Sequence, residues 1–531
     1  MLVRAVCQSK FIVVTRKDVG CSMEETMKED EVFPLAKESL VGVVGAGTMG
    51  RGIALVAASA GHNVYLYDVD SVAVEKAIEQ IGLDLDRMVK KGRLSNEDKK
   101  ERLARISPVD ALEGLSGAAL VIEAILEKLD VKVALFSALE SLVDSKAILA
   151  TNTSSLSVTA IAAKLKRPEQ FVGMHFFNPP MMMPLVEVVS GHATSAGIVQ
   201  IIYETAKAWG KVPVLCKSTP GFIVNRVARP FYGESLRLVN EQAASPAVLD
   251  CICREAGAFR MGPFELMDLI GHDVNFAVTS TVYEEFYHDP RYKPSLVQKA
   301  LVDAGWLGRK TGCGFYSYDG SVEQGDVASA SSSVQPTSIV VEGDLGVARP
   351  LVERAKAAGI RVEQKAGAGK IKIGDAVLAL TNGLTASELS ASWNEQVVLF
   401  DLVHDFNSTV RIAIAPGDAV KADSLDNAVG FFQALGMAVS VIDDAPGLVV
   451  MRTVAMIINE AADVVQQGVA NRQDVDLAMM KGVNYPLGPF QWMGVVGAKG
   501  VFNVIQNLGV IYGDDHYRPS PLLRRLAIAD K

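Results

Sequence analysis

The chain has 531 residues, of which 49% are hydrophobic and 21% charged, and its formal net charge is −9. This length is more than one hydrophobic core organises, so the sequence predicts several domains of ordinary globular composition. The acidic balance argues against a nucleic-acid surface, and no apolar run in the sequence is long enough to span a bilayer.

The cysteines indicate the redox environment. They show no paired spacing typical of a metal site, and no histidine cluster accompanies them; they are Cys7, Cys21, Cys216, Cys251, Cys253 and Cys313. A disulfide framework is not expected in a chain of this length. We therefore expect a reducing, cytoplasmic compartment and no metal site.

Residues 1–39 show no clear pattern of helix or strand. The apolar run at residues 11–14 is too short for a secretory signal, and the acidic run at residues 24–31 is unlike an organellar targeting peptide. The segment is either a tail or the product of a start codon placed upstream of Met23 or Met27.

The next stretch predicts a dinucleotide site. An apolar run leads into GAGTMG (residues 45–50) and then into a second apolar run, which is the order strand, tight turn, helix. The first glycine permits the turn, the second lets a pyrophosphate approach the backbone, and the third lets the helix pack on the strand. The free N–H groups of that helix would face the diphosphate. The predicted contacts in this turn are Gly45, Gly47, Thr48, Met49 and Gly50.

A carboxylate follows the next predicted strand. The apolar run at residues 63–67 ends in Asp68, which can accept hydrogen bonds from a ribose 2′-hydroxyl and would repel a 2′-phosphate. No arginine follows Asp68 directly, so the pattern favours NAD over NADP. The alternative is a strand, turn and helix that bind no ligand.

Strands and amphipathic helices alternate over residues 40–218, which predicts a parallel sheet with right-handed crossovers. One helix is expected at residues 72–91, and basic residues, Lys90, Lys91 and Arg93, gather at its end. These cations are either a solvated helix end or contacts to the phosphates of a bulky anionic substrate.

A hairpin is expected near the end of this region. Two apolar runs, at residues 171–177 and 185–189, flank a turn that contains an Asn-Pro step. Antiparallel pairing of these runs would bring His175 close to Glu187, where the carboxylate would set the tautomer of the imidazole and raise its basicity. The alternative is a structural histidine bonded inside the sheet.

The remaining chain divides into four segments. Helical periodicity dominates residues 219–320, a linker rich in Ser, Ala and Gly is expected at residues 321–337, a weaker α/β pattern occupies residues 338–443, and residues 444–531 are helical again. The turn at residues 381–384 lacks the three-glycine spacing, so we expect no second dinucleotide site. The predicted fold class is α/β plus all-α: a Rossmann domain, a helical domain, a reduced Rossmann-like domain and a second helical domain.

The second helical segment repeats the first. Residues recur at one offset of 226 without a gap: Pro220/Pro446, Gly221/Gly447, Arg226/Arg452, Glu234/Glu460, Asp250/Asp476, Gly262/Gly488, Pro263/Pro489 and Phe264/Phe490. Agreement at one fixed offset indicates an internal duplication. One position departs from the pattern, because Asn225 corresponds to Met451.

Five motifs carry a family resemblance. They are GAGTMG (45–50), EAILE (123–127), NTSS (152–155), HFFNP (175–179) and TPGFIVNR (219–226). In this order they closely resemble the L-3-hydroxyacyl-CoA dehydrogenase family over about residues 41–320. The tandem layout resembles the long bacterial members of the 3-hydroxybutyryl-CoA or 3-hydroxyadipyl-CoA type.

The resemblance implies a catalytic site and further NAD contacts. His175 matches the family's catalytic base and Glu187 its orienting carboxylate, while Ser154 and Asn225 match residues that contact the substrate. Because Asn225 belongs to the helical domain, the site would lie between two domains. The implied NAD contacts beyond the glycine turn and Asp68 are Glu127, Lys132, Asn178 and Lys310.

The resemblance also implies a reaction. The leading hypothesis is oxidation of an L-3-hydroxyacyl-CoA to the 3-oxoacyl-CoA with NAD, in fatty-acid or phenylacetate breakdown. One alternative is a dehydrogenase of a small free hydroxy acid such as L-gulonate, and another is an NAD-binding structural protein without catalysis. The intact set of four polar site residues argues against the structural protein.

The duplication suggests an intrachain partner. In the family the helical domain commonly forms a twofold contact between subunits, and a self-complementary surface can also pair within one chain. We expect residues 446–531 to dock against residues 220–300 of the same chain as a pseudo-twofold pair. An intermolecular contact, and hence a homo-oligomer, is the alternative. We expect no nucleic-acid or membrane partner.

Overall fold

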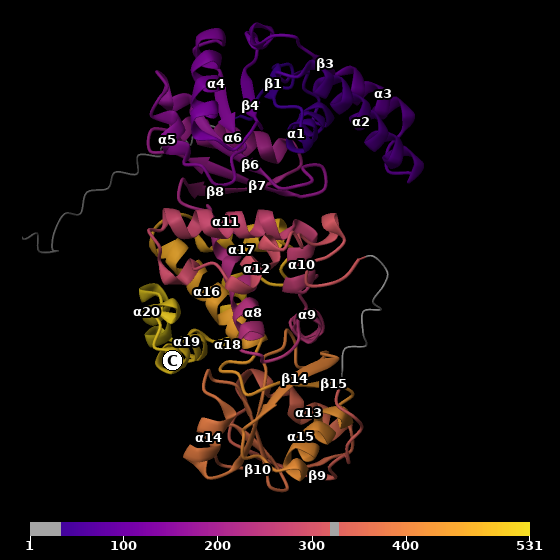
Figure 1. Cartoon of the computed structure of the whole chain (residues 1–531), viewed down its shortest axis with the longest axis vertical. Helices are drawn as coiled ribbons and strands as arrows, with labels where there is room; N and C mark the ends of the chain where they lie inside the picture. The colour runs from indigo at the N-terminus through magenta and orange to yellow at the C-terminus, as the bar shows by residue number, and fades with distance from the viewer. Residues whose placement is uncertain (1–32, 319–328, 531) are drawn as a thin grey trace, which may run out of the picture. The chain divides into compact units, whose positions relative to one another are not determined.

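The computed structural model describes residues 33–318 and 329–530 (Figure 1). Most of the predicted tail at residues 1–39 therefore lies outside the described residues. Its last part, residues 33–39, is a loop in which Leu35 N donates to Thr205 Oγ1 at 2.9 Å.

An eight-stranded sheet forms the first α/β domain, in the order β3-β2-β1-β4-β5-β6-β7-β8. Its neighbouring strands are parallel except for β6 and β7, which are antiparallel. The strands are β1 (Val41–Val44), β2 (Val64–Tyr67), β3 (Ile106–Pro108), β4 (Leu120–Glu123), β5 (Ile148–Thr151), β6 (Phe171–Phe176), β7 (Leu185–Ser190) and β8 (Val212–Lys217). Every residue of β1, β4, β5 and β6 is buried, as expected for strands covered on both faces.

Helices cover both faces of this sheet. One hydrophobic cluster joins it to α1, α2 and α6, and the other joins it to α4 and α5. The helices are α1 (Thr48–Ser59), α2 (Ser71–Lys90), α3 (Asn96–Ala104), α4 (Leu129–Leu142), α5 (Val158–Ala162) and α6 (Ala196–Ala208), with short 3₁₀ turns η1 (Leu112–Leu115) and η2 (Pro168–Gln170). The helix expected at residues 72–91 is α2, and Asp70 caps it by accepting a hydrogen bond from Val72 N.

The segment after β8 is helical, as predicted. Its elements are α7 (Val224–Val227), α8 (Arg229–Asn240), α9 (Pro246–Glu255), α10 (Pro263–Ile270), α11 (His272–Glu285), η3 (Pro290–Tyr292), α12 (Leu296–Asp303) and η4 (Arg309–Thr311). Asp250 on α9 accepts hydrogen bonds from the first N–H groups of α10, at Phe264 and Glu265, both at 2.9 Å. A β-carbon on Gly262 would lie 2.3 Å from that carboxylate, which explains why these residues recur together.

A second sheet of seven strands follows, in the order β10-β9-β11-β12-β13-β14-β15. It belongs to the orange part of the chain, where β9, β10, β14 and β15 are labelled (Figure 1). The strands are β9 (Ser338–Glu342), β10 (Arg361–Lys365), β11 (Lys370–Ile373), β12 (Ala376–Leu380), β13 (Gln396–Phe400), β14 (Arg411–Pro416) and β15 (Ala438–Val441), and the helices are η5 (Gly346–Ala348), α13 (Pro350–Ala357), α14 (Ala386–Trp393) and α15 (Ala422–Ala434). β13 and β14 are antiparallel, as β6 and β7 are in the first sheet. The predicted fold class is thereby confirmed.

Part of the predicted linker is ordered against this second sheet. Residues 321–328 lie outside the described residues, but residues 329–337 are described and form no helix or strand. Ala330 N donates to Val439 O at 2.8 Å, and Ser333 N donates to Gln433 Oε1 at 2.9 Å. The Ser- and Ala-rich composition predicts a flexible stretch. The composition does not reveal these hydrogen bonds, because their partners lie about a hundred residues further along the chain.

The second helical segment closes the chain. Its elements are α16 (Val450–Gln466), α17 (Arg472–Gly482), α18 (Pro489–Val496), α19 (Ala498–Tyr512), η6 (Asp515–Tyr517) and α20 (Pro521–Ala529). Within the described ranges, no single helix has both the length and the apolar composition to cross a membrane; α18 and α19 reach them only as a pair, across a bend of 96°.

The duplication extends further back than the sequence motifs indicate. β14, α15 and β15 each begin 226 residues after β7, α6 and β8, so the offset found in the helical segments also relates the two sheets. The repeated unit therefore includes the antiparallel end of the Rossmann-type sheet. The sequence comparison missed this part because buried aliphatic residues replace one another there without leaving a motif.

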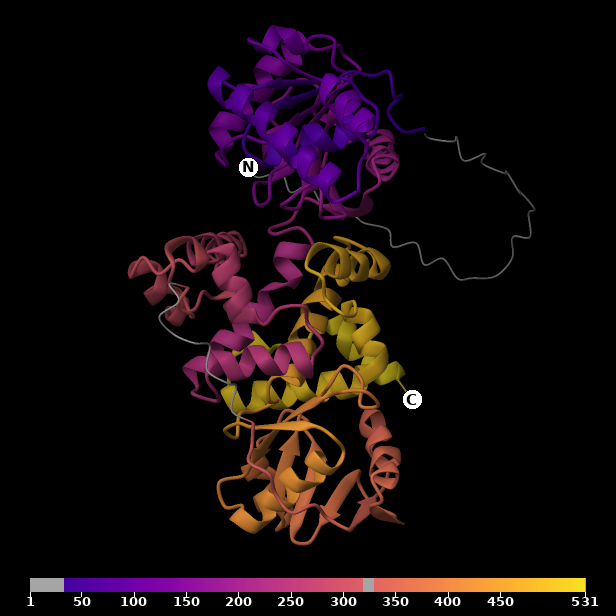
Figure 2. The same ribbon diagram turned by 90° about the vertical axis from the view of Figure 1, so that its right-hand side faces the viewer.

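The two helical copies pack against each other through α8 and α16 (Figure 2). Arg226 Nε of the first copy lies 2.5 Å from Glu460 Oε1 of the second, and Arg452 Nε lies 2.8 Å from Glu234 Oε2 in return. All four side chains are buried. The residues that recur at offset 226 thus face one another across the intrachain contact.

Each glutamate of this pair of contacts is enclosed by residues of the other copy. Glu460 also accepts from Tyr292 Oη at 2.6 Å, and Glu234 from Tyr517 Oη at 2.9 Å. The third partner of each glutamate is different: Arg291 contacts Glu460, whereas His516 contacts Glu234. We call these residues, Arg226, Glu234, Arg291, Tyr292, Arg452, Glu460, His516 and Tyr517, the interface ion network.

Candidate active site

The glycine turn fits a diphosphate. Gly45 has φ +105°, and a β-carbon there would lie 2.5 Å from Ala124 O, so only glycine is accommodated. A β-carbon on Gly50 would lie 1.7 Å from Gly45 O, whereas one on Gly47 would meet nothing within 4 Å. The backbone above Gly47 is therefore open. No side chain caps α1 at this point, which leaves its first N–H groups available to an anion.

Asp68 lies at the end of β2 beside this turn. Its Oδ2 accepts a hydrogen bond from Ala46 N at 2.7 Å and its Oδ1 accepts one from Asp70 N at 3.1 Å. The carboxylate is half-buried and holds the glycine turn to β2. A hollow of about 490 Å³ is bordered by Gly47 and Thr48 of the same turn, and the ribose contact of Asp68 remains a prediction.

Glu127 holds the loop that carries Ser154. Glu127 Oε1 accepts from Thr153 Oγ1 at 2.6 Å, from Ser154 N at 2.9 Å and from Ser155 Oγ at 3.1 Å. Burial raises the pKa of Glu127, but Lys132 and these hydrogen bonds outweigh it, so the pKa lies below its usual value. The structure thus gives Glu127 a supporting role, and its NAD contact remains a prediction.

Lys132 is buried beneath this loop. Its Nζ lies 2.5 Å from Glu123 Oε1 and 3.0 Å from Glu127 Oε2, and its side chain is 1% exposed. Glu123 in turn accepts from Thr151 Oγ1 at 2.7 Å. Lys132 therefore joins the end of β4 to the loop that follows it, and the NAD contact predicted for it stays a prediction.

His175 and Glu187 face each other across β6 and β7. They are register partners in the antiparallel pair, and His175 Nδ1 lies 2.6 Å from Glu187 Oε2. Glu187 is fully buried and His175 is 5% exposed. With Nδ1 engaged by the carboxylate, Nε2 is the ring nitrogen that remains for a substrate.

Glu187 also fixes the entry to the helical domain. Its Oε1 accepts from Ile223 N and Val224 N, both at 3.0 Å. The preceding turn places Phe222 at φ +49°, an uncommon conformation for a residue with a side chain. One carboxylate therefore positions both the imidazole and the start of α7.

Asn225 and Ser154 come together at this entry. Asn225 Nδ2 donates to the backbone oxygen of Ser154 at 3.3 Å, across the boundary between sheet and helices. Both residues are partly exposed. The hairpin, the Ser154 loop and α7 thus meet at one place, and this is where a substrate would bind.

Three other predicted contacts lie on the hairpin turn, on α1 and on η4. Asn178 is exposed at the start of the hairpin turn, Met49 is half-buried on α1, and Lys310 lies on η4, where its Nζ contacts Asp273 Oδ1 at 2.5 Å. At the end of α2, Lys90, Lys91 and Arg93 are exposed, and among the described residues none of them forms an ion pair.

The second half of the duplication lacks this chemistry. At offset 226, Asp401 takes the place of His175 and Ala413 that of Glu187, and Asp401 N bonds Ala413 O at 3.0 Å. The Asp401 carboxylate accepts from Val450 N at 2.7 Å and Met451 N at 3.0 Å, the role that Glu187 has in the first half. The substitution keeps the anchor of the helix and leaves no imidazole at this position.

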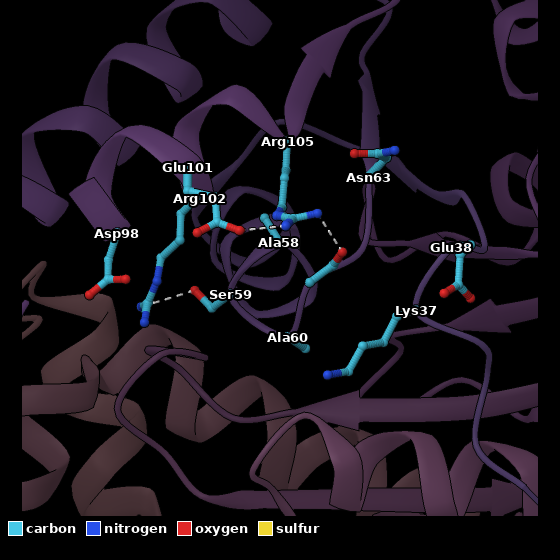
Figure 3. A pocket seen from close by; sticks show the side chains of 11 residues that line it. Lys37, Glu38, Ala58, Ser59, Ala60, Asn63, Asp98, Glu101, Arg102 and Arg105 are labelled. Atoms are coloured by element: carbon cyan, nitrogen blue, oxygen red, sulfur yellow. Dashed lines mark hydrogen bonds and ion pairs between the residues drawn. The ribbon is translucent and has the colours of Figure 1, made fainter.

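A hollow of about 580 Å³ on the first domain lies apart from these residues (Figure 3). Its arginines are already engaged: Arg105 donates to Gly61 O at 2.7 Å, and Arg102 donates to Ser59 Oγ at 3.3 Å. Both hold the C-terminal end of α1, so this hollow is part of the helix packing.

Family models match most of the described chain, with residues 329–377 unmatched. The NAD-binding domain of 3-hydroxyacyl-CoA dehydrogenase matches residues 40–219, and the C-terminal domain of that family matches residues 221–318 and again residues 447–531. The reduced Rossmann-fold domain of 3-hydroxybutyryl-CoA dehydrogenase matches residues 378–446.

Individual relatives agree with these matches. The chain is 45% identical to the 3-hydroxyadipyl-CoA dehydrogenase of Escherichia coli (strain K12) over 492 residues, which are 92% of this chain and 98% of that protein. It is 40% identical to the 3-hydroxybutyryl-CoA dehydrogenase of Clostridioides difficile over 277 residues, 52% of this chain and 98% of that protein. The crystal structure of a 3-hydroxybutyryl-CoA dehydrogenase from E. coli K12 superimposes with a TM-score of 0.86 at 43% identity, covering 93% of this chain and 99% of that one.

Fold and site together define a dinucleotide-dependent dehydrogenase with a duplicated helical domain. The chain belongs to the 3-hydroxyacyl-CoA dehydrogenase family, a family of NAD-dependent oxidoreductases. The family predicted from the five motifs is thereby confirmed.

Proposed function

We propose that this chain oxidises L-3-hydroxyacyl-CoA thioesters to 3-oxoacyl-CoA with NAD, at the place where the hairpin, the Ser154 loop and α7 meet. The observation that carries the proposal is the buried His175–Glu187 pair, 2.6 Å apart, in the same sheet as the open glycine turn. If His175 had a structural role alone, its bond to Glu187 would suffice. Glu187 would not also need to bind the start of α7.

His175 is the general base. Its Nε2 takes the proton of the substrate hydroxyl, and Glu187 stabilises the imidazolium that results. When bound, NAD accepts the hydride that leaves the carbon bearing this hydroxyl. Ser154 Oγ and Asn225 Nδ2 donate hydrogen bonds to the reacting oxygen or to the thioester carbonyl, where negative charge develops.

The remaining parts of the proposal concern substrate and cell. The relatives named above act on 3-hydroxyadipyl-CoA and 3-hydroxybutyryl-CoA, so we assign this chain to such substrates and to fatty-acid or phenylacetate breakdown. Lys90, Lys91 and Arg93, which form no ion pair with any described residue, would suit the phosphates of CoA. A cytoplasmic location accords with the described cysteines, all of which are free thiols.

Turnover of defined substrates tests this proposal. Purified full-length protein is incubated with NAD and either 3-hydroxybutyryl-CoA, 3-hydroxyadipyl-CoA or free L-gulonate, and NADH formation is followed by absorbance. We expect turnover of the thioesters and none of the free acid. Oxidation of L-gulonate without CoA would support the free-acid alternative, and no turnover of any compound would contradict the proposal.

The cofactor preference follows from Asp68. We expect Asp68→Ala to reduce the preference for NAD over NADP by about tenfold or more, because a charged hydrogen-bond acceptor for the ribose and its repulsion of a 2′-phosphate are both removed. The ratio of kcat/KM for the two cofactors measures this. Asp70→Ala, two residues further along, is the matched control and should leave the ratio unchanged; a wild type that uses both cofactors equally would contradict the role of Asp68.

A further inference from the structure

Arg229 differs from the other buried arginines of the described chain. Five arginines are buried, and four of them contact a carboxylate: Arg226, Arg291, Arg411 and Arg452. Arg229 is 7% exposed and donates only to neutral acceptors, with Nε 2.7 Å from Asn225 O and Nη1 2.9 Å from Thr279 Oγ1. A buried cation without a carboxylate is costly, so its retention calls for an explanation.

The electrostatic surroundings of Arg229 agree with this contact pattern. Burial lowers the pKa of Arg229, and only the phenols of Tyr232 and Tyr485 act against it. In contrast, the Glu460 carboxylate, together with Tyr292, outweighs burial at Arg226 and raises its pKa. The guanidinium of Arg229 lies over the ring of Tyr232, 4.9 Å from its centroid, which stabilises the cation without neutralising it.

A second polar group nearby also lacks a partner. Tyr485, which reaches this place from the second helical copy, is 6% exposed and packs edge-on against Phe259. Its hydroxyl is buried and, among the described residues, has no hydrogen-bond partner. The Tyr485 hydroxyl lacks an acceptor and the Arg229 guanidinium lacks an anion. An anion with two oxygens could bind both groups.

The position of Arg229 relates it to the reacting end of the substrate. It follows Asn225 by one helical turn, and its side chain reaches back to the backbone oxygen of Asn225. Asn225 in turn contacts the Ser154 loop. Arg229 and Thr279 both line a hollow of about 200 Å³, and the charged side chains that line it are all basic: Arg229, Arg237, Arg291, Lys293 and His516.

We propose that Arg229, with Thr279 and Tyr485, binds a carboxylate at the far end of the acyl chain, so that the preferred substrates are CoA thioesters of 3-hydroxy dicarboxylic acids. This rests on the proposed function. In a six-carbon diacid the second carboxylate is three carbons beyond the hydroxyl-bearing carbon, a separation comparable with one helical turn. A methyl-ended chain of equal length would leave the guanidinium unpaired.

Two substrates of equal length test the assignment. The kcat/KM of the full-length enzyme with NAD is compared for 3-hydroxyadipyl-CoA and 3-hydroxyhexanoyl-CoA. We expect the wild type to favour the diacid by about a hundredfold or more, and Arg229→Met to lose most of that preference while the hexanoyl rate changes less than about threefold. Arg229→Lys should restore part of the preference.

Further variants separate binding from structural support. Tyr485→Phe removes only the unpartnered hydroxyl, so we expect it to lower kcat/KM for the diacid and leave the hexanoyl value and the melting temperature unimpaired. Arg237→Met removes another cation of the same hollow, two turns along α8, and is the control that should leave the ratio unchanged.

The outcomes are distinguishable. An equal fall in kcat/KM for both substrates in Arg229→Met would show that Arg229 only positions Asn225. Equal kcat/KM values for both substrates in the wild type would show that no carboxylate is bound. Either result overturns this inference and leaves the dehydrogenase function standing. Failure of the wild type to oxidise either thioester would instead overturn the proposed function.

Discussion

His175→Gln is expected to lower kcat by at least about a hundredfold with little change in NAD affinity, because general-base catalysis contributes about 10²–10⁴ in rate. The substitution keeps a polar side chain in the strand pair but removes the nitrogen that accepts the proton. Steady-state turnover of 3-hydroxybutyryl-CoA gives kcat, and titration of protein fluorescence with NAD gives the cofactor affinity.

Glu187→Gln should reduce kcat by a similar amount for a different reason. The amide can still accept the bonds from Ile223 N and Val224 N, so α7 stays anchored, but its NH₂ group would donate to His175 Nδ1 and favour the tautomer that carries a proton on Nε2. His62→Gln, at another buried histidine of the same domain, is the matched control and should retain kcat within a few-fold. Near-normal turnover in either site variant would contradict the assignment of His175 as the base.

The second large effect is expected on stability. Glu460→Gln removes the carboxylate that lies 2.5 Å from Arg226 and leaves that buried guanidinium with neutral acceptors only. Breaking one side of a buried ion pair costs about 3–5 kcal/mol, so the midpoint of urea unfolding should fall markedly. Asp303→Asn, which breaks the exposed pair with Lys299, is the control and should leave the midpoint in place.

The acid dependence of stability gives an independent check. Burial raises the pKa of Glu460, but the charges of Arg226 and Arg291 outweigh burial, so the folded-state pKa lies below the unfolded value. A lowered carboxylate pKa contributes stability above about pH 4.5, and this contribution is lost as the pH falls through the folded-state value. The difference between wild type and Glu460→Gln should therefore shrink in acid. A difference that does not change with pH would contradict the ionic contribution.

The fold and much of the site could be predicted because local patterns determine them. Three glycines at fixed spacing require a tight turn, and an Asn-Pro step between two apolar runs requires a hairpin that sets His175 opposite Glu187. The recurring Arg226 and Glu234 were visible as a repeat, but the sequence does not say that each pairs with the other copy. That pairing depends on how two helices far apart in the chain pack.

Other features leave no local signal. Asp401 occupies the position of His175 in the second half, yet a single aspartate after an apolar run looks ordinary until the two sheets are aligned at offset 226. The unpaired state of Arg229 is likewise invisible in sequence, since an arginine in the first turn of a helix usually reaches solvent. Arg229 is buried partly by Tyr485 of the second copy, and this contact depends on how the two copies pack.

The interface ion network differs between its two ends, and this difference makes the two copies non-interchangeable. Arg291 contacts Asp463, whose counterpart at offset 226 is Arg237 in the first copy. If two first copies from separate chains were to meet by the same geometry, Arg291 of one would face Arg237 of the other, a contact between like charges. Such a contact would disfavour pairing between the first copies of two chains, so the contact between the two copies of one chain has a direction that a symmetric contact lacks.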